Sequence, residues 1–184
     1  MKAAIYEKYG SPEVLRIAEV PKPQPKANEI LVKVRAATVT SGDTRLRSSN
    51  FPPLFWLPAR LIFGLLKPKN KILGHELAGT VVECGKDVSD FQIGDEVFGT
   101  TTLLKGGSYA EYVCLPQKWK NGVVGKKPSN LNFEEAAALP IGAMTAMSLL
   151  EKAKLTKGQK VLVYGASGSV GSYAVQLAAA EGAE

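Results

Sequence analysis

The chain has 184 residues, of which 45% are hydrophobic, 22% charged and 8% aromatic, and its mean hydropathy is −0.02. This composition is typical of a globular protein with a substantial core, and it excludes a disordered tail, a collagen-like fibre and a disulfide-rich scaffold. Lys and Arg number 23 against 17 Asp and Glu, which gives a net charge of +6. Because the basic residues are scattered and not interleaved with aromatic ones, we expect no nucleic-acid partner.

The cysteines and the apolar segments indicate a cellular location. Cys84 and Cys114 lie thirty residues apart and no Cys-x-x-Cys pair occurs, which favours a reducing compartment and argues against a thiolate metal cage. The first eight residues lack the apolar stretch of a signal peptide. The most apolar stretch, residues 51–66, contains three prolines and Arg60, so it is not typical of a membrane span. We therefore expect a cytoplasmic protein with no membrane span.

Short strands separated by turns are predicted for the first two-thirds of the chain. Residues 29–40 alternate, with Ile30, Val32 and Val34 on one face and Lys33 on the other, as in a half-buried strand. Further strands are expected at residues 2–6, 14–20, 78–83, 96–99 and 108–115. Many short strands at this spacing predict a partly closed barrel or a sandwich.

The character of the sequence then changes, and we expect one domain over residues 1–128 and the beginning of another over residues 129–184. Asn132 and Glu135 form a capping-box signal, which predicts an alanine-rich helix over residues 135–154. An interruption of this helix is expected around Pro140 and Gly142.

A strand, a turn and a helix are predicted to follow. Residues 160–164 are a short apolar run suited to a buried parallel strand, and a helix is expected to run through Ala180, with Gly182 as its C-cap. Between them lies a glycine-rich turn, made of Gly165, Ala166, Ser167, Gly168, Ser169, Val170 and Gly171. This is the context of a dinucleotide site, because backbone amides at the positive end of a helix bind a pyrophosphate.

Two glycines of this turn have distinct predicted roles. A Cβ atom at Gly168 would block the approach of a phosphate, and Gly171 lets the helix lie tightly on the strand. Ala166 stands at the first position of the Gly-x-Gly-x-x-Gly pattern, so the match is partial. The residue that reads the ribose is expected about 20 residues downstream, so the preference for NAD or NADP stays open. A lone strand-turn-helix unit cannot bury its strand, so we expect the chain to be part of a longer polypeptide.

Besides the glycine turn, six short motifs stand in a characteristic order, at residues 1–3, 39–43, 74–79, 91–97, 107–112 and 137–146. Together these motifs resemble the medium-chain dehydrogenase/reductase superfamily, specifically its zinc-independent quinone oxidoreductase-like branch. The resemblance implies a GroES-like, partly closed β-barrel followed by the beginning of a Rossmann dinucleotide-binding domain, with the active site in the cleft between them.

The resemblance also bears on whether the protein binds a catalytic metal ion. Zinc-dependent relatives hold a catalytic ion with a Cys, the His of Gly-His-Glu and a third residue, usually another Cys. Here Thr40 stands in place of the first Cys, His75 is present, and residues 139–143 supply no third ligand. The four-cysteine structural lobe is also absent, and one His with hard oxygens is a poor zinc site, so we expect no metal.

Four catalytic residues and one further cofactor residue are implied. The Asp of the zinc relatives that matches Asp43 orients the ligand His, so we expect Asp43 within reach of His75, the only histidine. The pair fits either a proton relay or a buried His satisfied by a carboxylate, and Asp43 also fits a helix cap. Thr40 and Ser41 are the expected donors to a developing oxyanion, although Ser41 equally fits a plain turn. Thr145 resembles the family threonine that faces the cofactor.

Residues 51–66 are longer and more apolar than a loop should be, and residues 59–66 fit two helical turns. Three interpretations remain open: a lid over an apolar substrate site, a contact between two copies in a homodimer, and core for the open end of the barrel. A lid would favour bulky quinones or enones over small alcohols.

These observations and the resemblance predict a reductase that acts without zinc on an apolar quinone or α,β-unsaturated carbonyl. Its cofactor would be NADPH (or NADH), which would deliver hydride beside Thr40, Ser41 and Tyr109. Two alternatives differ in class: a catalytically silent fragment of such an enzyme, and a relative of the zinc-type alcohol dehydrogenases.

Overall fold

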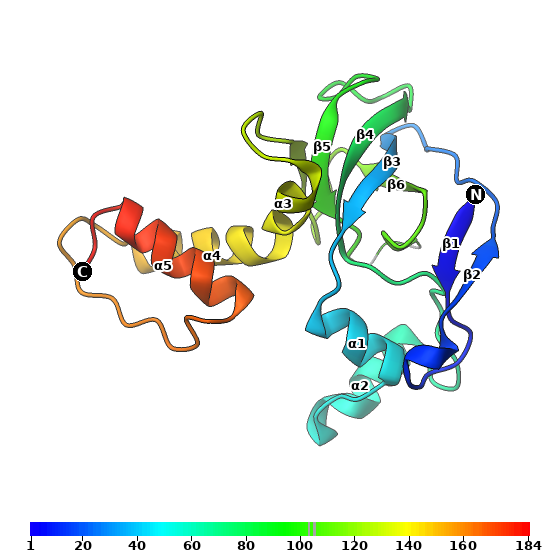
Figure 1. The fold of residues 1–184 in the computed structure, drawn as a ribbon, viewed down its shortest axis with the longest axis horizontal. Coiled ribbons are helices and arrows are strands. Elements are labelled where there is room, and N and C mark those ends of the chain that lie inside the picture. Colours follow the sequence, from blue (N-terminus) through cyan, green and yellow to red (C-terminus); the bar gives the residue numbers. More distant parts are fainter. Residues whose placement is uncertain (103, 105) are drawn as a thin grey trace. The chain divides into compact units, whose positions relative to one another are not determined.

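The structure of the protein is a computed structural model that describes residues 1–102, 104 and 106–184 (Figure 1). Within this part the chain divides into two units, Met1–Ala137 and Ala138–Glu184.

A five-stranded antiparallel sheet forms the centre of the first unit. Its strands, in the order β6-β3-β4-β5-β7, are β6 (Tyr112–Pro116), β3 (Glu29–Ala37), β4 (Glu76–Cys84), β5 (Glu96–Thr100) and β7 (Val124–Lys126). Val32 pairs with Val81 between β3 and β4, and the inward side chains of the sheet form a fully buried core around Ile30, Leu77 and Val97. The predicted strands are confirmed apart from their ends. The three residues of β7 were missed because they are too few to show an alternating pattern.

A second, two-stranded sheet pairs β1 (Lys2–Ile5) with β2 (Arg16–Glu19), which are connected through the short 3₁₀ helix η1 (Pro12–Val14). Single β-bridges attach β1 to the loops of the larger sheet, from Ala3 to Ala110 and from Ile5 to Ile72. In the described part of the chain both sheets are open. The predicted β-rich first domain is therefore present, as two open sheets that do not close into a full barrel.

Three helices complete the first unit: α1 (Ser41–Ser48), α2 (Pro53–Phe63) and α3 (Phe133–Ala137). The prediction of two helical turns at residues 59–66 was misplaced: the helix starts at Pro53, where proline is well tolerated in the first turn, and stops at Gly64, whose φ is +129°. The short α3 packs Ala136 and Ala137 against Ala78 of β4.

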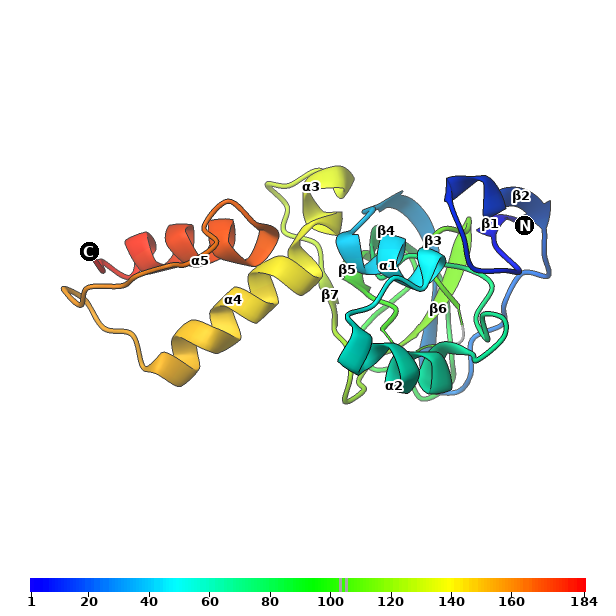
Figure 2. The same ribbon diagram turned by 90° about the horizontal axis from the view of Figure 1, so that it is seen from below.

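The second unit consists mainly of two helices, α4 (Leu139–Ala153) and α5 (Ser169–Ala180), which lie side by side (Figure 2). The predicted long helix is split, but the break falls at Ala138, earlier than expected, because Pro140 is accommodated in the first turn of α4. A Cβ atom on Gly142 would lie 2.4 Å from Oγ of Ser169, so this glycine allows the two helices to approach closely.

The expected strand at residues 160–164 was wrong. No strand forms there, and the side chains of Leu162 and Tyr164 are 94% and 101% exposed. A parallel strand needs paired neighbours and covered faces, and the described residues offer this segment only Glu184. The amide of Glu184 donates to the carbonyl of Gln159 at 2.8 Å, and its carbonyl accepts from the amide of Val161 at 2.8 Å. These two bonds have the pattern of a parallel β-bridge.

The helix ends of the second unit follow the sequence. α5 ends at Ala180 as expected, but its C-cap is Glu181, and the predicted Gly182 follows one residue later in the left-handed conformation, with φ +77°, that closes many helices. None of the described helices is long and apolar enough to cross a bilayer.

Candidate active site

The site begins at the N-terminus of α1, where a capping box fixes two predicted residues. The Thr40 hydroxyl accepts the amide of Asp43 at 3.3 Å, and the Asp43 carboxylate accepts the amide of Thr40 at 2.9 Å. The Thr40 hydroxyl also donates to Asp43 Oδ2 at 2.7 Å. The proposed helix-capping role of Asp43 is therefore real, with Thr40 as the N-cap and Asp43 at the third helical position.

The second oxygen of the same carboxylate reaches across the fold to the loop before β4. Nδ1 of His75 lies 2.6 Å from Asp43 Oδ1, which also accepts the amide of Gly74 at 3.2 Å. Asp43 is only 2% exposed, whereas His75 remains partly exposed. The expected contact between Asp43 and His75 is thus formed. Because the carboxylate is the partner of Nδ1, that nitrogen carries a proton, and Nε2 is free for another partner.

Burial and hydrogen bonding act in opposite directions on the Asp43 carboxyl. Burial raises its pKa, but the hydrogen bonds from His75 and Thr40 outweigh the burial, so that the pKa lies below its ordinary value. The carboxylate is therefore ionised at neutral pH although it is enclosed. Burial raises the pKa of the neighbouring Tyr109 phenol, and the negative charge of Asp43 raises it further.

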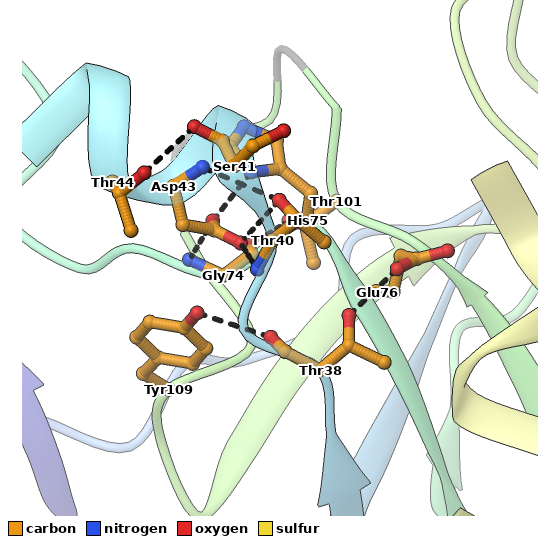
Figure 3. A network of polar contacts seen from close by, with 10 residues as sticks. All are labelled: Thr38, Thr40, Ser41, Asp43, Thr44, Gly74, His75, Glu76, Thr101 and Tyr109. Carbon is orange, nitrogen blue, oxygen red and sulfur yellow. Dashed lines mark hydrogen bonds and ion pairs between the residues drawn. The ribbon is translucent and has the colours of Figure 1, made fainter. Parts of the chain in front are cut away.

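Two further residues of the network, Thr38 and Glu76, were not found from the sequence. The Tyr109 hydroxyl donates to the carbonyl of Thr38 at 3.0 Å, and the Thr38 hydroxyl donates to Glu76 Oε2 at 2.6 Å (Figure 3). Glu76 is 4% exposed, which makes it the second buried carboxylate of the site. The only sequence signal for Glu76 was its position next to His75 in the Gly-His-Glu motif. This position does not show that the carboxylate is buried.

A cavity of about 560 Å³ opens beside this network. Most of its lining is apolar, and it includes both His75 and the end of α2. Among the lining residues are Tyr6, Leu46, Ile62, Phe63, Leu73 and His75. Burial, followed by Tyr9 and Asp43, raises the pKa of Tyr6 to about 12, so its phenol stays protonated. The cavity therefore offers an apolar volume with one imidazole in its wall.

Ser41, the fourth predicted catalytic residue, lies beside this network but does not join it. It is the first residue of α1 and is exposed, and its carbonyl accepts the Thr44 hydroxyl at 2.9 Å (Figure 3). The structure thus brings Thr40, Asp43 and His75 together, whereas the Ser41 side chain has no described partner.

The predicted cofactor residues lie in the second unit. Gly165 has φ +82°, and a Cβ atom on Gly171 would lie 2.2 Å from the carbonyl oxygen of Gly165, so the turn requires glycine at both positions. A Cβ atom on Gly168 would meet only that same oxygen, at 3.4 Å, so the space in front of this N-cap is open. Thr145 is exposed on α4.

This turn fits a phosphate. No side chain caps α5, and the amides of its first turn, from Ser169, Val170 and Gly171, point out of the helix without intrahelical acceptors. Ala166 and Ser167 complete an exposed loop in front of them. Backbone amides of this kind at the positive end of a helix are a general anion site.

The donor set does not fit zinc. Within residues 1–102, 104 and 106–184, no three His, Cys, Asp or Glu side chains gather into a metal-binding group. Nδ1 of His75 is already bonded to the Asp43 carboxylate. The Thr40 hydroxyl also donates to that carboxylate. A single imidazole without a thiolate or second imidazole lacks the donors that zinc prefers.

Comparison with known proteins identifies the fold and its family. Residues 26–128 match the alcohol dehydrogenase GroES-like domain. A 2-methylene-furan-3-one reductase of Solanum lycopersicum is 37% identical over 185 residues, which cover 97% of this chain and 44% of that protein. A quinone oxidoreductase of Coxiella burnetii matches with a TM-score of 0.80 and 33% identity, over 100% of this chain and 54% of that one.

A third similarity is to the Escherichia coli quinone oxidoreductase whose structure was solved in complex with NADPH, with a TM-score of 0.78, 30% identity and coverage of 100% of this chain and 51% of that one. The chain belongs to the medium-chain dehydrogenase/reductase superfamily, as a member of its quinone oxidoreductase-like branch with a GroES-like domain. It spans about half the length of the curated relatives it matches.

Proposed function

We propose that the protein is the part of an NAD(P)H-dependent reductase that binds an apolar quinone or α,β-unsaturated carbonyl and carries the phosphate-binding turn of its cofactor. The observation that carries this proposal is the apolar cavity with His75 in its wall and Asp43 behind that imidazole. The names of similar proteins, quinone oxidoreductase and 2-methylene-furan-3-one reductase, support the same substrate classes.

The residues of the first unit would position and polarise the substrate. Apolar side chains of the cavity, such as Leu73 and Phe63, would hold the ring or chain of the substrate and exclude water. The Asp43 carboxylate holds the His75 imidazole through Nδ1, and a protonated imidazole in this position would donate Nε2–H to the substrate oxygen where negative charge develops. Thr40 holds Asp43 in place.

The second unit would hold the cofactor, as the beginning of a Rossmann domain. The first-turn amides of α5 and the open space at Gly168 would bind the pyrophosphate, and Thr145 would lie towards the nicotinamide. Bound NADPH or NADH would supply the hydride. We infer that the reaction needs no zinc, because the residues around His75 lack a second nitrogen or sulfur donor.

The reaction is tested in a polypeptide that includes this chain. NADPH is paired with a quinone or with an enone, and NADP is paired with a primary alcohol. We expect NADPH oxidation with the quinone or the enone and no turnover of the alcohol. Dialysis against a chelator should leave the rate unchanged. No turnover with either acceptor would contradict the proposal, and a loss on chelation that zinc reverses would identify a zinc-dependent enzyme.

The role of His75 is tested by His75→Gln. Glutamine can still donate a hydrogen bond to the substrate but cannot carry a charge, so we expect kcat to fall about tenfold to a hundredfold and its pH dependence to flatten. Turnover that is unchanged at every pH would leave His75 as a structural partner of Asp43 without a part in the chemistry.

The cofactor site is tested by titration with NADPH in a calorimeter. Gly168→Ala should fold normally, because its methyl group fits beside Gly165, but it should weaken NADPH binding about tenfold, since the methyl occupies the phosphate approach. Gly106→Ala is a matched control in the first unit, where the added methyl meets only Val113 at 3.8 Å. Equal affinities of the two variants would refute the assignment of the turn.

A further inference from the structure

The positive charge of the chain is concentrated in one segment. Residues 44–71 contain six basic residues and no acidic one, and the rest of the chain holds 17 basic and 17 acidic residues, so this segment accounts for the whole net charge of +6. The individual basic residues are scattered, but their excess is not. Only Lys71 in this segment forms a described ion pair, with Glu7 at 2.7 Å; the five others in the segment are Arg45, Arg47, Arg60, Lys67 and Lys69.

The same segment contains the most exposed apolar surface of the first unit. Leu54 is 81% exposed. Six more apolar side chains on α2 and directly after it are each at least 49% exposed: Phe55, Leu57, Leu61, Ile62, Leu65 and Leu66. Figure 2 shows α2 at the edge of the first unit, with α1 on one side of it. This exposure removes the interpretation that residues 51–66 are core for the open end of the sheet.

The helix is well anchored although its outer side is uncovered. The Arg60 guanidinium donates to Ser49, the C-cap residue of α1, at 3.0 Å and lies 4.0 Å from the ring centroid of Tyr9, and Lys69 donates to the carbonyl of Leu61 at 2.8 Å. The apolar side chains of α2 thus belong to a helix that is fixed to the first unit. The Arg60 guanidinium and the Lys69 ammonium lie on or against the same helix.

We propose that α2 and residues 64–69 dock this protein on the surface of a membrane that contains anionic lipids. The eleven residues of α2 are too few to cross a bilayer, but a short apolar helix with flanking cations suits the boundary between headgroups and acyl chains. Anionic headgroups would neutralise the five cations that lack a carboxylate partner within the described residues.

Charge favours this occupant over a second copy of the chain. A twofold contact through α2 would bring the two copies of residues 44–71 together, and because this segment has six basic residues and no acidic one, like charges would oppose the contact. A bilayer with anionic headgroups removes that repulsion and accepts the apolar side chains of the helix.

The docking surface adjoins the cavity. Ile62 is exposed on α2 and, with Phe63, also lines the cavity that contains His75. If the proposed reductase function holds, its substrate class is narrowed to quinones or enones dissolved in the bilayer, which would enter the cavity past the end of α2. The docking itself does not depend on the reaction.

The test is flotation of the protein with vesicles of phosphatidylcholine, with and without about 30% phosphatidylserine. We expect flotation only with the anionic vesicles, and release as the salt concentration rises. The variant Leu54→Ser with Leu61→Ser should reduce binding at least about tenfold, while the control variant Ile17→Ser with Ile93→Ser, which removes isoleucines of similar exposure elsewhere, should not.

A second pair of variants tests the charge without disturbing the apolar surface. Arg45→Gln with Lys67→Gln should weaken flotation, whereas Lys33→Gln with Lys120→Gln, an equal loss of charge outside the segment, should not. Equal binding of the two pairs, or no flotation of the wild type, would overturn the proposal. So would a wild-type dimer in solution that Leu54→Ser with Leu61→Ser converts to a monomer, because a second copy would then cover α2. Flotation is measured without turnover, so this result and that of the reductase assay are independent.

Discussion

At the scale of single residues, Asp43 has two structural roles. It closes the first turn of α1 through Thr40, and it fixes the loop before β4 through Gly74 and His75. The two roles use different oxygens of one carboxylate, so they do not compete. A buried charge with this many donors is stabilised where it stands, and the removal of its charge affects both segments.

Replacing Asp43 with Asn should lower the free energy of unfolding at neutral pH by about 2 kcal/mol, because an amide cannot accept all of these hydrogen bonds. Because the pKa of Asp43 in the folded protein is below its ordinary value of 3.8, its contribution is complete above that value and disappears as the pH falls through the lower folded pKa. Urea unfolding between pH 7 and pH 2 should show the difference between wild type and variant shrinking in acid.

Asp90→Asn serves as the control for this comparison, since Asp90 pairs with Lys118 at the surface. Its effect on urea unfolding should be much smaller than that of Asp43→Asn. A difference between Asp43→Asn and wild type that stays constant down to pH 2 would show that the carboxylate charge contributes nothing to the fold.

The sequence indicated part of this network for a physical reason. The Thr-x-x-Asp spacing of residues 40–43 is a local capping pattern, so it is visible in the chain itself. The contact of Asp43 with His75 joins residues 32 positions apart, and only the family resemblance suggested it. Nothing in the local pattern predicted that Tyr109 would donate to Thr38, because that bond depends on how two loops meet.

At the scale of elements, β3 was predictable because alternation with a period of two is strong in a half-buried strand. α2 was misplaced because three prolines suggest a loop, although two of them stand at or before the first turn, where proline is tolerated. The segment 160–164 shows the opposite error: its apolar residues favour a buried strand, but strand formation depends on neighbours that no local pattern encodes.

Close backbone packing between β3 and β4 makes Gly79 a sensitive position. A Cβ atom there would lie 2.3 Å from the carbonyl oxygen of Lys33 and 2.8 Å from Val32. Gly79→Ala should therefore destabilise the first unit by about 2 kcal/mol, measured by thermal or urea unfolding. Gly106→Ala, which meets no atom closer than 3.8 Å, is the matched control and should be near neutral. Equal stability of the two variants would show that the β3–β4 pairing is looser than described.

At the scale of the whole molecule, the two units differ in what they bury. The first encloses large side chains such as Ile30, Leu77 and Leu115 completely. In the helices of the second unit, the buried residues are all small: Pro140, Gly142, Ala146, Ala174 and Ala178. Since hydrophobic stabilisation scales with the apolar area removed from water, the second unit has much the weaker core.

Hydrogen exchange should show this difference directly. Amides of β3 and β4 should be protected at least about a hundredfold more strongly than those of α4 and α5, because local opening costs little where few apolar contacts are lost. Saturating NADPH should slow exchange in the first turn of α5 and leave β3 unchanged. Equal protection of strands and helices would contradict the description of two unequal units.

The pairing of the strands also bears on how the polypeptide matures in the cell. Every strand of the two sheets finds its partners between Lys2 and Lys126, and α3 covers the larger sheet by Ala137. A ribosome that has released this stretch has released all the strand pairs that the described residues form in these two sheets. These strand pairs can thus form during translation, before the helices of the second unit are synthesised.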